Sequence, residues 1–176
     1  MTTLMSTTFF TFGKTLLAKS AAIKGFIVRK GESRFGSSTP FQGINPNDLK
    51  ISATDTAGMI SMFEYTGNAK TGPPLHIHKD QDEIFYIAEG EYLFQLGDEK
   101  FKAIAGDTIF GVRNVPHTWI QLSPKGKIVY LVQPAGKMEE FFSKINELKG
   151  PLSDELAKKI HHDHGMEVLG PPLIIN

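Results

Sequence analysis

Three histidines and one glutamate in the middle of the chain have the residue types and the spacing of a metal site. His76 and His78 are one residue apart, Glu83 follows five residues later, and His117 is the next histidine along the chain. Positions i and i+2 of a β-strand point to the same face, so His76 and His78 can both face inward. Imidazole and carboxylate ligands suit Fe, Mn, Ni, Co, Cu or Zn, and the chain has no cysteine that would narrow the choice. We therefore expect one divalent transition metal per chain.

Composition limits the classes of partner. The 176 residues include 19 basic and 19 acidic side chains, so no net charge attracts nucleic acid or an anionic membrane. No apolar run approaches the roughly 20 residues that span a bilayer. The sequence also lacks a phosphate-binding glycine motif, a Gly-x-Ser-x-Gly motif and a cysteine nucleophile. We expect a cytoplasmic protein that binds a small-molecule substrate and neither nucleic acid nor membrane.

Short β-prone runs fill the chain from residue 26 to residue 135, separated by clusters of Gly, Pro, Ser and Asn. These runs are Phe26–Lys30, Asp48–Ala53, Met59–Tyr65, Leu75–His78, Glu83–Glu89, Glu91–Leu96, Lys100–Ala105, Thr108–Phe110, His117–Leu122 and Lys127–Gln133. Gly90 and Gly97 fall where tight turns are needed, because glycine adopts positive φ at little cost. Many short strands without intervening helices indicate an antiparallel sandwich or a small barrel over residues 26–135.

The two ends of the chain differ from this middle region. In residues 1–25, Lys14 and Lys19 interrupt the apolar patches, which favours an N-terminal arm or short helix over a signal peptide. After Pro134, apolar residues recur at helical spacing, and Ser153 is a good cap for a second helix. Residues 136–176 are thus predicted as two helices and an apolar tail that lies along the barrel or a neighbouring subunit, within one domain overall.

The residues around the histidines resemble the two sequence motifs of the cupin family. The run Gly72–His78, followed by Glu83 and Gly90, is similar to the first motif, and the run Gly106–Gln121 is similar to the second. The tail, with Gly170–Pro172, is similar to that of small bacterial single-domain cupins of the quercetin 2,3-dioxygenase-like type. The resemblance implies an all-β double-stranded β-helix, or jelly-roll, barrel, here with an N-terminal arm and two C-terminal α-helices. It also implies a homodimer.

The resemblance assigns His76, His78, Glu83 and His117 as the metal ligands. Some other positions depart from the motifs. Three residues lie between Gly72 and His76, where the first motif usually has five intervening residues. Val112 and Asn114 occupy a proline and a glycine position of the second motif, and Gln121 replaces its closing asparagine. None of these is a ligand position, so the departures affect loop geometry rather than the ligand set.

Period-two alternation predicts which side chains share the inner face with the ligands. Glu83 is followed on that face by Phe85 and Ile87, and His117 by Trp119 and Gln121. Such a wall is mostly apolar and aromatic, which suits a planar or aromatic ligand. We predict Phe85, Trp119 and Gln121 as substrate contacts, with a place in the barrel core as the alternative for each.

Two further features lie outside this inner face. Arg113, in the loop before His117, is predicted to attract an anionic substrate group, with a solvated loop arginine as the alternative. His161, His162 and His164 form a second cluster at the end of a predicted helix. We expect them to be exposed, where their partial positive charge suits a helix C-terminus, although they could also chelate metal adventitiously.

The leading functional hypothesis is a metal-dependent dioxygenase that acts with O₂ on a small aromatic or enolic, quercetin-like substrate, as the resemblance suggests. Glu83 would then be the catalytic base, because a carboxylate bound to a metal keeps a second oxygen. One alternative is an isomerase or lyase of a small oxygenated metabolite, which would need more polar groups in the pocket. The other is a non-catalytic, metal-stabilised binding protein.

Overall fold

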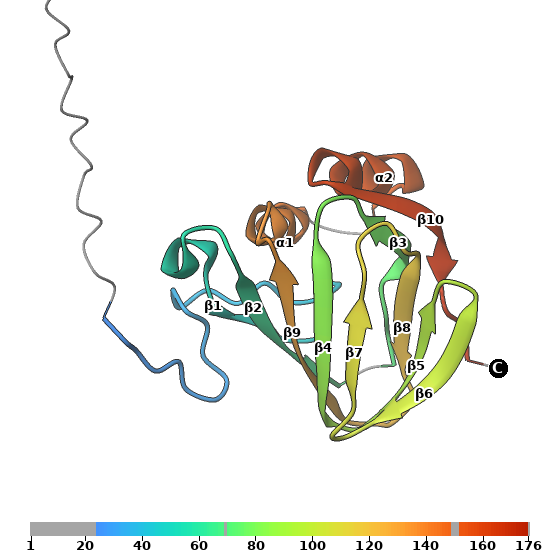
Figure 1. The fold of residues 1–176 in the computed structure, drawn as a ribbon, viewed down its shortest axis with the longest axis horizontal. Helices are drawn as coiled ribbons and strands as arrows, with labels where there is room; N and C mark the ends of the chain where they lie inside the picture. The colour runs from blue at the N-terminus through green and yellow to red at the C-terminus, as the bar shows by residue number, and fades with distance from the viewer. Residues whose placement is uncertain (1–23, 69, 149–151, 176) are drawn as a thin grey trace, which may run out of the picture.

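The computed structural model describes residues 24–68, 70–148 and 152–175, and ten strands in these ranges form two five-stranded antiparallel sheets (Figure 1). The first sheet has, in spatial order, β1 (Asn47–Ile51), β2 (Ser61–Gly67), β9 (Gly126–Gln133), β4 (Asp82–Glu89) and β7 (Thr108–Gly111). The second has β10 (Met166–Pro172), β3 (Pro74–His78), β8 (His117–Gln121), β5 (Glu91–Leu96) and β6 (Glu99–Ile104). The helical segments are η1 (Ala53–Thr56), α1 (Met138–Glu147) and α2 (Asp154–Asp163). The predicted all-β jelly-roll barrel is confirmed.

The core lies between the two sheets and is rich in aromatic rings. Buried and less buried residues alternate along β2 and β9, as expected for strands with one face against a core. From these strands Phe63 stacks on Tyr130, with ring centroids 5.2 Å apart. Gly90 and Gly97 both have positive φ, which confirms the predicted turns at each end of β5.

The C-terminal segment closes one end of the barrel and one edge of the second sheet (Figure 1). Helix α1 buries Met138, Phe141 and Phe142, and α2 begins after Ser153, whose side chain accepts a hydrogen bond from the backbone N–H of Leu156. The predicted apolar tail becomes strand β10, which pairs antiparallel with β3. As an edge strand, β10 tolerates its prolines, because an edge position does not need every N–H for a ladder.

One predicted strand is wrong. Phe26–Lys30 is irregular and leads into a turn, in which the N–H of Glu32 donates to the carbonyl of Arg29 at 3.1 Å. Ile27 is 71% exposed, and the guanidinium of Arg34 lies over the ring of Phe26. The β-prone composition has no effect here because the segment has no neighbouring strand in the described residues with which to pair. The arm predicted for residues 1–25 lies almost wholly outside the described residues.

Glu139 of α1 holds this helix to the barrel. Its carboxylate accepts hydrogen bonds from Ser52 Oγ at 2.9 Å, from the N–H of Ala53 at 2.6 Å, and from Ser61 Oγ. Removal of the carboxylate leaves these donors without their partner, so Glu139→Ala should lower the free energy of unfolding by about 2–3 kcal/mol. Denaturant titration measures this loss. The exposed neighbour gives the control Glu140→Ala, and equal stability of the two variants would contradict the role of Glu139.

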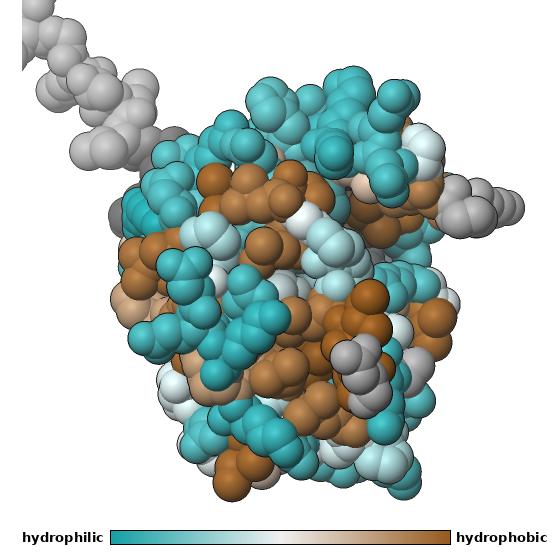
Figure 2. All heavy atoms as spheres, turned by 90° about the vertical axis from the view of Figure 1, so that its right-hand side faces the viewer, coloured by the Kyte–Doolittle hydropathy of each residue, from teal (hydrophilic) through white to brown (hydrophobic). Residues whose placement is uncertain are grey.

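The surface of the second sheet carries apolar side chains. Figure 2 views the side with β5, β6 and β10, where apolar residues gather in the middle and the region of α2 above them is hydrophilic. The exposed apolar residues of this sheet include Ile104 and Leu169. The homodimer expected from the sequence stays a prediction.

Among the described residues, no helix has the length and apolar character needed to cross a membrane.

Candidate metal centre

Strand β3 places His76 and His78 on the inner face of the barrel. Their side chains are buried, whereas that of Ile77 between them is only partly covered. The Nε2 atoms of the two histidines are 3.2 Å apart. Both rings therefore point inward, as predicted from the alternation of side chains along a β-strand.

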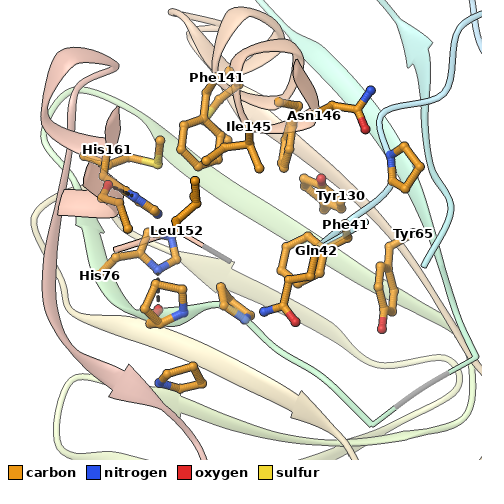
Figure 3. A pocket seen from close by; sticks show the side chains of 18 of the residues that line it. Phe41, Gln42, Tyr65, His76, Tyr130, Phe141, Ile145, Asn146, Leu152 and His161 are labelled. Carbon is orange, nitrogen blue, oxygen red and sulfur yellow. Dashed lines mark hydrogen bonds between the residues drawn. The ribbon is translucent and has the colours of Figure 1, made fainter. Parts of the chain in front are cut away.

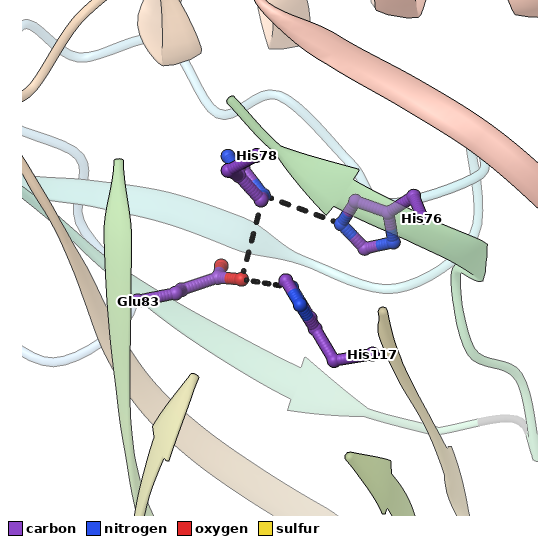
Figure 4. Close-up of side chains that lie close together, drawn as sticks. All are labelled: His76, His78, Glu83 and His117. Atoms are coloured by element: carbon purple, nitrogen blue, oxygen red, sulfur yellow. Dashed lines mark hydrogen bonds and ion pairs between the residues drawn. The ribbon is translucent and has the colours of Figure 1, made fainter. Parts of the chain in front are cut away.

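The other two residues of the cluster come from the starts of two further strands. His117 opens β8 and is paired across the ladder with His76 of β3. Glu83, near the start of β4, reaches in from the opposite sheet, with its Oε2 atom 3.1 Å from His117 Nε2 and 3.5 Å from His78 Nε2 (Figure 4). One ligand atom from each of the four buried residues lies within 4.8 Å of the others. This cluster could hold a metal ion.

Each histidine of the cluster is oriented through its other ring nitrogen. The Nδ1–H groups of His76 and His117 donate to the carbonyls of Pro74 at 2.8 Å and Val115 at 2.9 Å. His78 Nδ1 lies 3.2 Å from Gln81 Oε1. With the proton on Nδ1, each Nε2 presents a lone pair to the centre of the cluster, which is the arrangement that metal-ligating histidines have. In this tautomer neither Nε2 atom of His76 and His78 carries a proton, so the two atoms cannot hydrogen-bond to each other. Their two lone pairs suit a bound cation.

The pKa values of the three histidines in the cluster depend on burial and on the carboxylate of Glu83. Burial, with the nearby rings of His117 and His78, holds the pKa of His76 well below its usual range. Burial also lowers the pKa of His78, although the charge of Glu83 opposes this effect. For His117, burial disfavours the charged form, but the hydrogen bond and the charge of Glu83 outweigh it and raise the pKa. Metal ligation needs neutral imidazoles, so at His117 a bound metal would replace the proton that Glu83 favours.

Gln81 is a functional residue that sequence reasoning missed. Its Oε1 atom faces His78 Nδ1, while its Nε2–H₂ group donates to the carbonyls of Ala135 at 2.7 Å and Pro134 at 3.0 Å. The amide thus links the ring of His78 to the chain just after β9. The only indication of this role in the sequence was the position of Gln81 in the short segment between His78 and Glu83.

The variant Gln81→Leu should therefore weaken metal binding by about 10–100-fold, as the loss of such outer partners usually does. The ring of His78 would lose the acceptor that fixes its orientation. Competition of the purified protein with a chromophoric chelator gives the affinity. Gln95→Leu is the matched control, because within the described residues the side chain of Gln95 bonds only to the nearby carbonyl of Gly97. An affinity of Gln81→Leu equal to that of the control would rule out the proposed link.

A cavity of about 680 Å³ lies beside the cluster and is bordered by His76, His78 and Glu83 (Figure 3). Its wall is largely apolar and includes aromatic rings from Phe41, Tyr65, Phe85, Trp119, Tyr130, Phe141 and Phe142. Trp119 stacks on Phe41 at a centroid distance of 5.7 Å and meets Tyr65 edge-on at 5.0 Å. The strands supply one side of this cavity, and α1, α2 and the loop Pro40–Gly43 supply the other. Such a space fits a small, flat, mostly apolar molecule.

Comparison with known proteins identifies this architecture. Residues 62–133, which include all four residues of the cluster, match the family model described as "Cupin domain". The chain contains a cupin domain. The chain is 46% identical over 43 residues to an uncharacterized protein, MJ1618, from Methanocaldococcus jannaschii. That match covers 24% of this chain and 34% of the relative, so the chain spans about a third of the length of this curated relative.

A solved structure with a TM-score above 0.5 supports this fold. KdgF from Halomonas sp. superposes with a TM-score of 0.54 at 15% identity, over 64% of this chain and 94% of that one. A RmlC-like cupin from Shewanella frigidimarina NCIMB 400 gives a TM-score of 0.47 at 17% identity, over 55% and 82% of the two chains. At these identities the likeness concerns the fold alone.

Two of the four predicted substrate contacts border the cavity and two do not. Phe85 and Trp119 border the cavity, whereas Gln121 and Arg113 lie outside its lining. The side chain of Gln121 does face inward, but its amide donates to the carbonyl of Ser123 at 2.8 Å and accepts from the hydroxyl of Tyr65. The core therefore already supplies the partners that we had expected from a substrate.

Arg113 is held at the surface by Asp82. Its guanidinium donates to both carboxylate oxygens of Asp82, at 2.6 and 3.1 Å, and the hydrogen bonds from Arg113 lower the pKa of that carboxyl to about 2. A guanidinium paired in this way is not directed at the cavity.

The expectation that the second histidine cluster is exposed is wrong for two of its members. His161 and His164 are 9% and 8% exposed, and only His162 is open to solvent. Phe141 of α1 packs against both buried rings, at centroid distances of 4.8 Å and 5.8 Å. The contact between α1 and α2 covers these histidines. His161 also borders the cavity.

Proposed function

We propose that this cupin is a metal-dependent dioxygenase for a small aromatic or enolic, quercetin-like substrate. The observation that carries the proposal is that the ligand cluster opens directly into an aromatic cavity of about 680 Å³. His76, His78, Glu83 and His117 would hold the metal, which would supply Lewis acidity and redox chemistry with O₂.

The residues of the chain bind and orient the substrate around that site. Phe85 and Trp119 provide flat apolar surface for an aromatic ring, and the same surface keeps water from the reacting atoms. Such a wall supports an aromatic substrate better than a polyol, which would need several hydrogen-bonding groups. An isomerase or lyase of a sugar-like molecule is therefore the weaker proposal.

Glu83 is the proposed catalytic base. Its Oε2 atom faces His78 and His117, whereas no hydrogen bond within the described residues engages Oε1 (Figure 4). Oε1 would take the proton of the substrate hydroxyl as that oxygen becomes the enolate or phenolate. Proton transfer by a positioned side chain contributes about 10²–10⁴-fold to the rate.

Oxygen consumption tests this proposal. The protein is loaded anaerobically with Fe(II), Mn(II), Co(II) or Ni(II) in separate samples, and uptake of O₂ is followed with 3-hydroxyflavone or with flavone, which lacks the hydroxyl group. We expect metal-dependent uptake with 3-hydroxyflavone only. The absence of uptake with every metal and with a series of flavonols and catechols would overturn the proposal.

The variant Glu83→Gln separates proton transfer from metal binding. We expect kcat to fall by about 10²-fold or more, because an amide cannot accept the proton. Metal content is measured on the same sample, and the rate is expressed per bound metal. Equal rates per metal in Glu83→Gln and the wild type would remove Glu83 from the catalytic role.

A further inference from the structure

His161 adds a further imidazole to the cavity wall, outside the four-residue cluster. It belongs to α2, beyond residues 62–133 of the cupin match, and its ring centroid is 6.4 Å from that of His76. The rings of His76 and His117 are closer to each other, at 4.5 Å. Figure 3 shows the rings of His161 and His76 on the same side of the cavity, with Leu152 beside them. His161 is therefore a neighbour of the cluster rather than a member of it.

The orientation of His161 is fixed, and one of its nitrogens is left available. Nδ1 donates to the carbonyl of Ala157, one helical turn earlier, at 2.7 Å. The edge-on contact with Phe141 holds the plane of the ring. With the proton on Nδ1, Nε2 is an acceptor, and within the described residues no hydrogen bond engages it.

Several other polar groups of the cavity wall already have partners. The hydroxyls of Tyr65 and Tyr130 donate to Gln121 and Asn47, at 3.2 and 2.8 Å. The amide of Gln42 donates to the carbonyl of Gly72 at 2.9 Å. Asn146 lies at the exposed side of α1. His161 Nε2 thus differs from these groups, since it is an acceptor without a hydrogen bond in the described residues, on a largely buried ring that borders the cavity beside the ligand cluster.

We propose that His161 Nε2 accepts a hydrogen bond from a substrate hydroxyl group that neighbours the oxygen facing the ligand cluster. The substrate class is then an aromatic or enolic molecule with two adjacent oxygens, such as a catechol or an α-hydroxy enone. This inference rests on the proposed function for the position of the first oxygen. Phe141 and Leu152 pack around His161, so the second oxygen meets one acceptor in an otherwise apolar surface. His161 is a positioning residue for the substrate in this account.

Binding of two probes to zinc-loaded protein tests the inference without O₂ chemistry. Isothermal titration calorimetry compares catechol with 2-methoxyphenol, which keeps one hydroxyl and replaces the other by a methyl ether. The ratio of the two affinities is measured in the wild type and in His161→Phe, which keeps the apolar packing but lacks the acceptor. We expect the preference for catechol to fall by about tenfold in His161→Phe, the value of one hydrogen bond of ordinary strength.

Two further variants make the result specific. His161→Gln places an amide oxygen near the position of Nε2 and should retain most of the preference. His162→Phe changes the exposed neighbour in the same helix and should leave the ratio unchanged. An unchanged ratio in His161→Phe would overturn the inference, and so would a wild-type protein that does not bind catechol. Loss of zinc from both His161→Phe and His161→Gln would instead make His161 part of the metal site and would likewise overturn it.

The test also distinguishes this inference from the proposed function. Zinc does not support redox chemistry, so the probe affinities do not depend on whether the protein consumes O₂. A protein that prefers catechol through His161 but shows no O₂ uptake with any metal would retain the binding inference and lose the dioxygenase proposal.

Discussion

The variant His78→Ala is expected to lose stoichiometric metal binding. In the wild type the Nε2 atom of His78 is 3.2 Å from His76 Nε2 and 3.5 Å from Glu83 Oε2, and His78 is 1% exposed. Loss of an outer partner of a ligand costs about 10–100-fold in metal affinity, so loss of the ligand itself should cost at least about 100-fold. Elemental analysis after dialysis against micromolar metal, on protein without a histidine tag, measures the stoichiometry.

The control for this experiment is His162→Ala. This change removes an exposed histidine from the second cluster and should leave one metal per chain. A chelator should lower the melting temperature of the wild type and of His162→Ala, because a ligand that binds the folded state stabilises it. It should have little effect on His78→Ala. Wild-type metal content in His78→Ala, or its loss in His162→Ala, would place the metal at the other cluster.

A second large effect is expected from Gly72→Ala. A Cβ atom at this position would lie 1.8 Å from the carbonyl oxygen of Trp119 and 3.2 Å from the Cα of Ile120. These are main-chain atoms of β8, so no side-chain rotation can relieve the overlap. The segment before β3 would have to move away from β8, which also breaks the bond from Thr118 Oγ1 to the carbonyl of Pro73.

We therefore expect Gly72→Ala to lower the free energy of unfolding by about 3 kcal/mol or more, as overpacking against a rigid neighbour does. Because β3 carries His76 and His78, metal affinity should fall as well. Chemical denaturation of the metal-free proteins isolates the packing effect. Gly25→Ala is the control, because a Cβ at Gly25 has no neighbour within 4 Å. A Gly72→Ala protein as stable as this control would show that the approach of the two strands is not required.

Local patterns in the sequence predicted the parts of the site that depend on one strand. The i, i+2 spacing of His76 and His78 places both rings on the inner face, and the same alternation explains the burial of Phe85 and Trp119. The assignment of Glu83 and His117 as metal ligands came from the resemblance to cupins. Their positions depend on pairing between distant strands, and spacing along the chain does not specify that pairing.

The errors occurred where a side chain finds its partner far along the chain. Gln121 was expected to need a substrate, but Tyr65 from another strand supplies a hydrogen bond to it. His161 was expected at the surface, where a partial positive charge suits a helix C-terminus, but packing of Phe141 from α1 covers it. Propensity also failed for Phe26–Lys30, since a β-prone run without a neighbouring strand does not form one.

The shell of atoms around the bound metal is the most direct test of this account. X-ray absorption at the zinc edge, on tag-free protein loaded with one equivalent of zinc, reports the type and number of ligands. We predict three imidazole nitrogens and at least one oxygen, all at about 2.0–2.2 Å, and two imidazoles in His117→Ala. A shell with fewer than three imidazoles in the wild type, or a spectrum unaffected by His117→Ala, would contradict the assignment of the metal to His76, His78, Glu83 and His117.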